Sequence, residues 1–179
     1  EAGALEPNLH DAAVAMASRA GDARRFEALR ARFKVEPDPA FKRRYLTGLA
    51  LFEAPELAAR AEELAFGEEI PLQDAASYMG ALLGNRSARD GFWAALRQRW
   101  DAVQKRVGGA PMLLRRVFEA VGQLPLRRHL DEATAFFAEH PVPAARQAIA
   151  QTLERMRQDV ELWERIGPAV ARWLEARTR

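Results

Sequence analysis

The apolar residues of this chain recur at helical spacing almost throughout, and no stretch alternates apolar and polar residues as a half-buried strand does. The clearest case is a predicted helix over 87–107, in which five apolar residues lie three or four positions apart: Trp93, Leu96, Trp100, Val103 and Val107. This spacing places them on one face of a helix, which must be buried against other helices. The fold class is therefore expected to be all-α.

Turn signals divide the chain into about ten helices. The expected segments are 9–20, 23–34, a third helix from Pro39, 55–66, 72–83, 87–107, and helices around 114–121, 130–137, 145–156 and 163–173. Asp22 and Asp38 are predicted N-caps, and Gly108-Gly109 is predicted to end the longest helix.

Three further local predictions concern packing and helix ends. In the third helix, four aromatic or aliphatic residues are expected to share one buried stripe: Phe41, Tyr45, Leu49 and Phe52. Asp159 is expected to cap a separate last helix, marked by Trp163, Ile166, Val170 and Trp173. Pro168 is expected to kink that helix.

Ten helices joined by short turns form five consecutive antiparallel pairs. A spacing of about 35 residues per pair favours a HEAT/armadillo-like α-solenoid over a closed bundle. A length of 179 residues suits one compact unit, so residues 1–179 are expected to form a single helical-repeat domain.

Composition argues against several partners. The net charge is +2, and arginine doublets such as Arg24-Arg25 lie among acidic residues or on predicted helix surfaces. They are interpreted as solvated helix faces, so no nucleic acid is expected to bind. The arginine count nevertheless leaves a nucleic-acid binder as a third possible function.

No apolar run approaches a bilayer span and Glu1–Leu5 lacks a signal peptide's features, so a soluble chain without a membrane partner is expected. Because there is no cysteine, the compartment stays unknown.

No constellation of catalytic residues is visible. His10, His129 and His140 lack metal-binding spacing, and His140 is expected to sit at a helix C-terminus. The carboxylate pairs Glu62-Glu63 and Glu68-Glu69 are expected to be solvated rather than catalytic. No catalytic residue, metal ligand or cofactor is therefore predicted in this segment.

A series of short motifs does point to a family. In order they are Arg44-Tyr45-Leu46, Leu49-Ala50, Pro55-Glu56-Leu57, Ile70, Gln73-Asp74, Gly84-Asn85, Trp93, Trp100, Phe136-Phe137-Ala138-Glu139-His140-Pro141, Gln151-Thr152-Leu153-Glu154 and Trp173-Leu174. Their order and spacing resemble the C-terminal helical domain of the aminopeptidase N family of zinc metalloaminopeptidases, which includes the puromycin-sensitive and endoplasmic-reticulum aminopeptidases.

The resemblance implies a non-catalytic domain that caps an active site and shapes a peptide chamber. The family's Gly-Ala-Met-Glu-Asn and His-Glu-x-x-His motifs are absent, so the segment alone is not expected to be an enzyme, whereas its parent is expected to be a zinc metalloaminopeptidase. Zinc is then expected in a missing catalytic domain of the same polypeptide. Because the chain starts at Glu1 rather than methionine, it is expected to be the distal C-terminal part of a larger protein.

Two residues are candidates for contact with the peptide chamber, Arg86 and Gln123. Family members often carry a basic residue just before the Gln-Asp pair, but Pro71 and Leu72 stand there in this chain. The alternative function is a free-standing helical-repeat module that binds a protein partner on its concave face.

Overall fold

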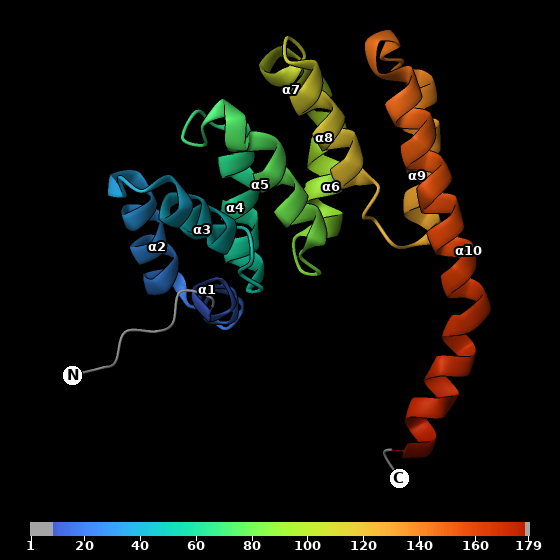
Figure 1. Cartoon of the computed structure of the whole chain (residues 1–179), viewed down its shortest axis with the longest axis horizontal. Helices are drawn as coiled ribbons and strands as arrows, with labels where there is room; N and C mark the ends of the chain where they lie inside the picture. The colour runs from blue at the N-terminus through green and yellow to red at the C-terminus, as the bar shows by residue number, and fades with distance from the viewer. Residues whose placement is uncertain (1–8, 178–179) are drawn as a thin grey trace. The chain divides into compact units, whose positions relative to one another are not determined.

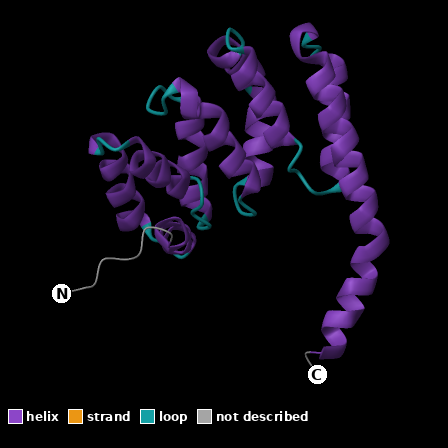
Figure 2. Ribbon diagram, viewed as in Figure 1, coloured by secondary structure: helices purple, strands orange, loops and turns teal. Residues whose placement is uncertain are grey.

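The computed structural model describes residues 9–177, so the N-terminal residues Glu1–Leu5 lie outside the described part. Within that range the chain forms α-helices and a short 3-10 helix, with no strand (Figure 2). This confirms the predicted all-α class. The contacts divide the chain into two compact units, residues 1–117 and 118–179.

The first unit is built from consecutive helix pairs (Figure 1). Its helices are α1 (His10–Arg19), α2 (Ala23–Val35), α3 (Pro39–Leu49), α4 (Pro55–Phe66), α5 (Leu72–Gly84), α6 (Arg89–Gln98), α7 (Trp100–Val107) and the first part of α8 (Pro111–Val121). Helix α2 packs on α3 and α4 on α5, while α3 also packs on α5 and α4 on α6. Several helices of this unit therefore pack on the helix two places along the chain as well as on a sequence neighbour.

Local signals set several helix starts in this unit. The Asp22 side chain accepts a hydrogen bond from the Arg25 amide at 2.9 Å. Asp38 accepts hydrogen bonds from the amides of Ala40 and Phe41 at 2.8 and 3.2 Å. These side chains satisfy amides that have no partner inside the helix, which confirms both predicted N-caps.

The predicted 87–107 helix is two helices. All five residues of its apolar stripe are at most 2% exposed, which confirms their burial. However, Arg99 has φ −105° and ψ 24°, outside the helical range, and it separates α6 from α7. Its guanidinium donates to both Glu63 oxygens at 2.7 and 3.0 Å and lies 4.7 Å from the Phe66 ring centre. The helix break coincides with these contacts to α4. No glycine or proline stands at this point of the sequence, so no local signal predicts the break.

The predicted stripe of the third helix is only partly correct. Leu49 and Phe52 are fully buried, but α3 ends at Leu49 and Phe52 lies in the following loop. There its ring packs edge-on against Phe26, 5.1 Å between centres. Phe41, in the first turn of α3, is 37% exposed, and the Arg44 guanidinium lies 4.7 Å from its ring centre.

The second unit contains the end of α8, then α9 (Arg127–Glu139), the 3-10 helix η2 (Pro143–Ala145) and α10 (Arg146–Arg177). Helix α10 packs along α9. The ring of Phe118, in the end of α8, meets that of Phe137 of α9 edge-on with 5.3 Å between centres, and Met156 of α10 is fully buried. His140 follows α9 directly, as predicted, and its Nδ1 lies 3.0 Å from the Phe136 carbonyl oxygen.

The prediction of separate ninth and tenth helices was wrong, because α10 is continuous over 32 residues. Asp159 lies inside it rather than at a cap. No glycine or proline interrupts residues 146–166, and Met156 and Val160 stay buried in one helical register through this point. Pro168, the predicted kink site, lies inside this continuous helix, and Figure 1 shows α10 curving along the C-terminal half that contains it. In the residues that the structure describes, no helix is long and apolar enough to cross a membrane.

Candidate functional site

A groove of about 510 Å³ lies between α2, α4 and the turn that joins α4 to α5. Apolar side chains of Phe26 and Leu64 contribute to its lining. Its other lining residues are mostly charged: Arg30, Arg60, Glu63, Glu68 and Glu69. The groove is therefore an apolar hollow with a rim of both charge signs.

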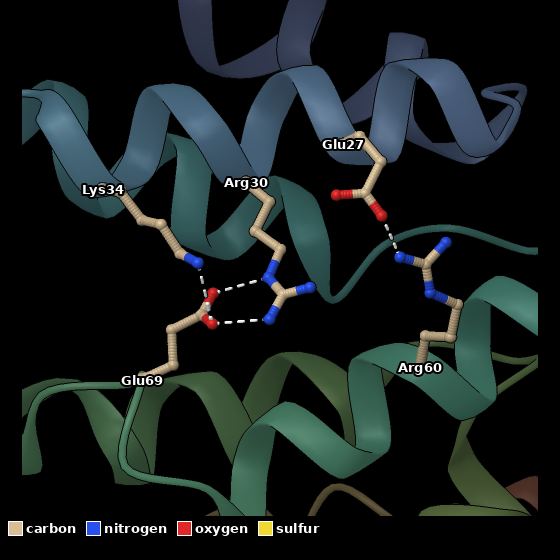
Figure 3. Close-up of polar contacts among 5 residues, drawn as sticks. All are labelled: Glu27, Arg30, Lys34, Arg60 and Glu69. Atoms are coloured by element: carbon tan, nitrogen blue, oxygen red, sulfur yellow. Dashed lines mark hydrogen bonds and ion pairs between the residues drawn. The ribbon is translucent and has the colours of Figure 1, made fainter.

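Ion pairs cross this groove from α2 (Figure 3). The Arg30 guanidinium donates two hydrogen bonds to the Glu69 carboxylate, Nε to Oε1 at 2.7 Å and Nη2 to Oε2 at 2.6 Å. Lys34, one turn further along α2, places its Nζ 3.2 Å from the same carboxylate. One turn earlier, Glu27 pairs with Arg60 of α4. Three side chains on one face of α2 thus fasten it to α4 and the α4–α5 turn.

The ion pairs also set the protonation of the groove. The hydrogen bond from Arg30 is the main reason that the pKa of Glu69 is lowered, despite partial burial that acts the other way. The same bond raises the pKa of Arg30. Both groups therefore stay charged at neutral pH and neither is poised to exchange a proton, so the cluster joins helices rather than catalysing proton transfer.

The neighbouring carboxylates Glu62 and Glu63 have different environments. Glu63 is exposed as predicted, and hydrogen bonding from Arg99 lowers its pKa. Glu62 is half-buried, contrary to the prediction of a solvated pair, and burial together with the charge of Glu63 raises its pKa. Its Oε1 lies so close to α6 that a Cβ atom at Gly91 would be 2.8 Å away. Close approach of α4 and α6, rather than chemistry, accounts for this burial.

The α4–α5 turn is held from a second side by Arg106 of α7. Its guanidinium donates to the Ala65 carbonyl at 2.6 Å and also to the Ile70 carbonyl. Burial lowers the pKa of Arg106. Because two carbonyls bind this side chain, the turn that ends the groove is fixed by α2 and α7 together.

The α5–α6 turn is pinned by a buried asparagine. The Asn85 side-chain amide donates to the carbonyls of Ala50 and Phe52 at 2.9 and 2.8 Å, and its oxygen accepts from the Ser87 amide at 3.0 Å. Asn85 is 6% exposed. It therefore joins the α3–α4 loop to the α5–α6 turn. The sequence indicated Gly84-Asn85 only as a helix end and a family motif, since only the tertiary structure brings the two loops together.

The two predicted chamber residues both lie in turns. Arg86 is exposed in the α5–α6 turn, directly after the pinned Asn85. Gln123 is exposed in the turn between α8 and α9. Arg86 belongs to the first compact unit and Gln123 to the second.

The histidines do not form a zinc site. Among residues 9–177 no group of three or more His, Cys, Asp or Glu side chains is placed to hold a metal ion. His129 is fully buried and its Nδ1 accepts from the Leu126 amide at 3.4 Å, while His140 Nδ1 faces a helix carbonyl. The residues present therefore do not fit the zinc that the family resemblance implies.

Stacked helices whose turns are fastened by arginine and asparagine define a helical scaffold domain. Residues 1–158 match the ERAP1-like C-terminal domain, and the chain belongs to that family. It is 26% identical over 163 residues to Aminopeptidase M1-B of Oryza sativa subsp. japonica, covering 91% of this chain and 17% of that protein. It is 23% identical over 131 residues to Aminopeptidase M1-C of the same organism, covering 73% of this chain and 15% of that protein.

These matches confirm the predicted relationship to the C-terminal domain of aminopeptidases. The chain spans less than a fifth of the length of either relative.

Proposed function

We propose that this chain is the non-catalytic C-terminal domain of a zinc aminopeptidase, which caps the active site and shapes the chamber that admits peptides. The observation that carries the proposal is the match of residues 1–158 to the ERAP1-like C-terminal domain. Zinc and the reacting groups then belong to a catalytic domain elsewhere in the same polypeptide. Peptides with a free N-terminus are the substrates of that parent enzyme.

The packing of the first unit suits a wall around a chamber. A wall that excludes folded proteins must keep its turns in place, and here the turns are held by buried hydrogen bonds from Asn85 and a part-buried one from Arg106. Domain closure over an active site commonly gates substrate entry and product release. A stack of rigid helix pairs can move as one body in such a closure.

Arg86 and Gln123 are proposed as the chamber-facing residues. Arg86 carries a permanent positive charge that can bind a peptide carboxylate through two parallel hydrogen bonds. The Gln123 amide can both donate to and accept from a peptide backbone. Both side chains are exposed, so neither is committed to the core.

The role in catalysis is tested by reconstitution. Zinc content and hydrolysis of aminoacyl chromogenic substrates are measured for this chain alone, for the catalytic part of its parent polypeptide, and for both together. Zinc-dependent hydrolysis that requires the catalytic part and improves when this chain is added is the expected result. Hydrolysis by this chain alone would refute the proposal, and a catalytic part that is indifferent to this chain would favour the free-standing interaction module.

The chamber residues are tested in the full polypeptide with peptides of increasing length. Arg86→Ala and Gln123→Ala are each expected to raise KM for longer peptides by about tenfold, the loss of one good charged or polar contact, with little change for a single aminoacyl substrate. Arg24→Ala is the matched control, because Arg24 is an exposed arginine on α2. Equal effects of Arg86→Ala and Arg24→Ala would remove Arg86 from the chamber.

A further inference from the structure

The C-terminal half of α10 carries an exposed apolar face. Six of its large side chains are 38–58% exposed: Leu162, Trp163, Ile166, Val170, Trp173 and Leu174. With 3.6 residues per turn, they fall within an arc of about 120° on the side of the helix opposite Pro168. A continuous face of this kind marks an interaction site rather than scattered surface residues.

The exposed face continues a helical stripe that is already an interface. In the first half of α10, Ile149, Met156 and Val160 are at most 9% exposed, and this half packs against α9. Helix α9 begins at Arg127, whose guanidinium binds Glu164 with two hydrogen bonds at 3.1 and 2.6 Å. Beyond this point α10 continues to Arg177, about 20 Å further at 1.5 Å per residue (Figure 1).

The pattern of this face is a palindrome centred on position 168. Residues at equal distances on either side of the centre match: Leu162 with Leu174, Trp163 with Trp173, and Ile166 with Val170. In an antiparallel pair of identical helices related by a two-fold axis, residues equidistant from the centre lie opposite each other. A palindromic face is therefore complementary to a second copy of itself.

The charges on the face follow the same antiparallel logic. Two charged residues lie on the face itself, Asp159 nine positions before the centre and Arg177 nine positions after it, whereas the other charged residues of 159–177 lie on the Pro168 side of the helix. An antiparallel pair places the acidic end of one copy against the basic end of the other. A parallel pair would place like-charged ends together, which is unfavourable. Asp159 and Arg177 are the pair of opposite charge that the symmetry aligns on this face, because they are equidistant from position 168.

We propose that two copies of this chain associate through the C-terminal halves of α10, antiparallel, with the two-fold axis passing beside position 168. Six half-exposed large side chains present on the order of 500 Å² of apolar surface per copy, taking roughly 150–250 Å² for each when fully exposed. Two such faces would remove about 1,000 Å² from water, near the lower limit for a specific interface. An interface of this size is typical of weak, transient association, so the expected dissociation constant is micromolar or weaker. This inference does not depend on the aminopeptidase proposal.

Association is measured by sedimentation velocity of the 179-residue chain across concentrations from about 1 to 300 µM, a range set to bracket the expected dissociation constant. A monomer–dimer equilibrium is expected. The double variant Trp163→Glu/Trp173→Glu should raise the dissociation constant about tenfold or more and leave helicity unchanged, because both side chains are exposed. Met112→Glu is the matched control, since Met112 is 66% exposed on α8.

A monomer at every concentration would overturn the proposal. A dimer that is equally weakened by Met112→Glu, or unaffected by the two tryptophan substitutions, would overturn it as well.

The register is tested by disulfide formation, because the chain contains no cysteine. Ile166→Cys and Val170→Cys are oxidised separately and as a mixture. The antiparallel register places position 166 of one copy opposite position 170 of the other. Position 166 of one copy and position 166 of the other are instead about 6 Å apart along the axis, and the same holds for position 170. The mixture should therefore form cross-linked dimer several-fold faster than either variant alone. Gly109→Cys is the control, since a Cβ there has no atom within 4 Å.

Rapid cross-linking of each single variant with itself would indicate a parallel pair and refute the register. Equal cross-linking by Gly109→Cys would show that random collisions account for the dimer, which also contradicts the proposal.

Discussion

Replacement of Asn85 by alanine tests the view that one buried side chain joins two inter-helix turns. The substitution removes three hydrogen bonds, to the Ala50 and Phe52 carbonyls and from the Ser87 amide. Each such bond contributes about 1 kcal/mol, and a buried group left without a partner costs about 1–3 kcal/mol. Because Asn85 is 6% exposed, water reaches the vacated site poorly. We expect a loss of about 3 kcal/mol in the free energy of unfolding.

The loss is measured by urea unfolding at 25 °C, followed by tryptophan fluorescence and far-UV circular dichroism. At this chain length, 3 kcal/mol corresponds to a fall in Tm of roughly 6–12 °C. Gln123→Ala is the control, because Gln123 is a polar side chain exposed in a turn, and it should change the stability by less than about 0.5 kcal/mol. If Asn85→Ala costs no more than this control, the reasoning about the pinned turn is refuted.

Asn85→Asp adds a pH signature to the same test. The introduced carboxyl keeps an acceptor for the Ser87 amide but places negative charge against two carbonyl oxygens, so its pKa in the folded state should rise above the unfolded value of about 3.9. A raised pKa means that the protonated form stabilises the fold and that this stability is lost as pH rises through the folded pKa. The variant should therefore be closest to the parent chain near pH 4 and furthest from it at pH 7. A stability difference that is independent of pH would contradict this account.

Three further substitutions test separate contacts. Trp100→Ala should lower the free energy of unfolding by about 3–5 kcal/mol, because Trp100 is 2% exposed on the buried stripe, and an unchanged denaturation midpoint would contradict its core role. Glu69→Gln should cost about 0.5–1 kcal/mol at pH 7, the range for a partly exposed ion pair. Since Arg30 lowers the pKa of Glu69, this stability is present above the unfolded carboxyl pKa and is lost as pH falls through the folded value, so parent and variant unfolding curves should converge below about pH 4. Gly48→Ala should cost about 1–3 kcal/mol, because the added Cβ would lie 2.7 Å from Cγ1 of Val14 where α1 meets α3, and an unchanged Tm would show that the two helices separate freely.

Local signals were sufficient for most helix boundaries. Asp22 and Asp38 cap helices as predicted, and Pro39 and Pro55 are the first residues of α3 and α4. These outcomes depend on the side chain and backbone within three or four residues, so the amino-acid order alone encodes them. The same kind of signal failed at Asp159, because a capping residue starts a helix only where the chain is not already helical.

The candidate site was less accessible to prediction. Arg86 and Gln123 come from the family resemblance, and the structure shows both exposed in turns. Glu62 was expected to be solvated like Glu63, but α6 approaches so closely at Gly91 that its carboxylate is half-buried. Burial at this position depends on a second helix almost thirty residues away in the sequence, which no local pattern reports.

The sequence by itself determined the all-α class, the buried stripe through Trp93 and Trp100, and membership of the ERAP1-like C-terminal domain family. It did so because helical periodicity and motif order are one-dimensional properties of the chain. Only the tertiary structure decided that the helix breaks at Arg99, that Asn85 binds a loop some 35 residues away, and that the last apolar stripe is exposed. Each of these outcomes depends on which two surfaces pack together. A period of 3.6 residues indicates which residues share a helix face but not what that face packs against.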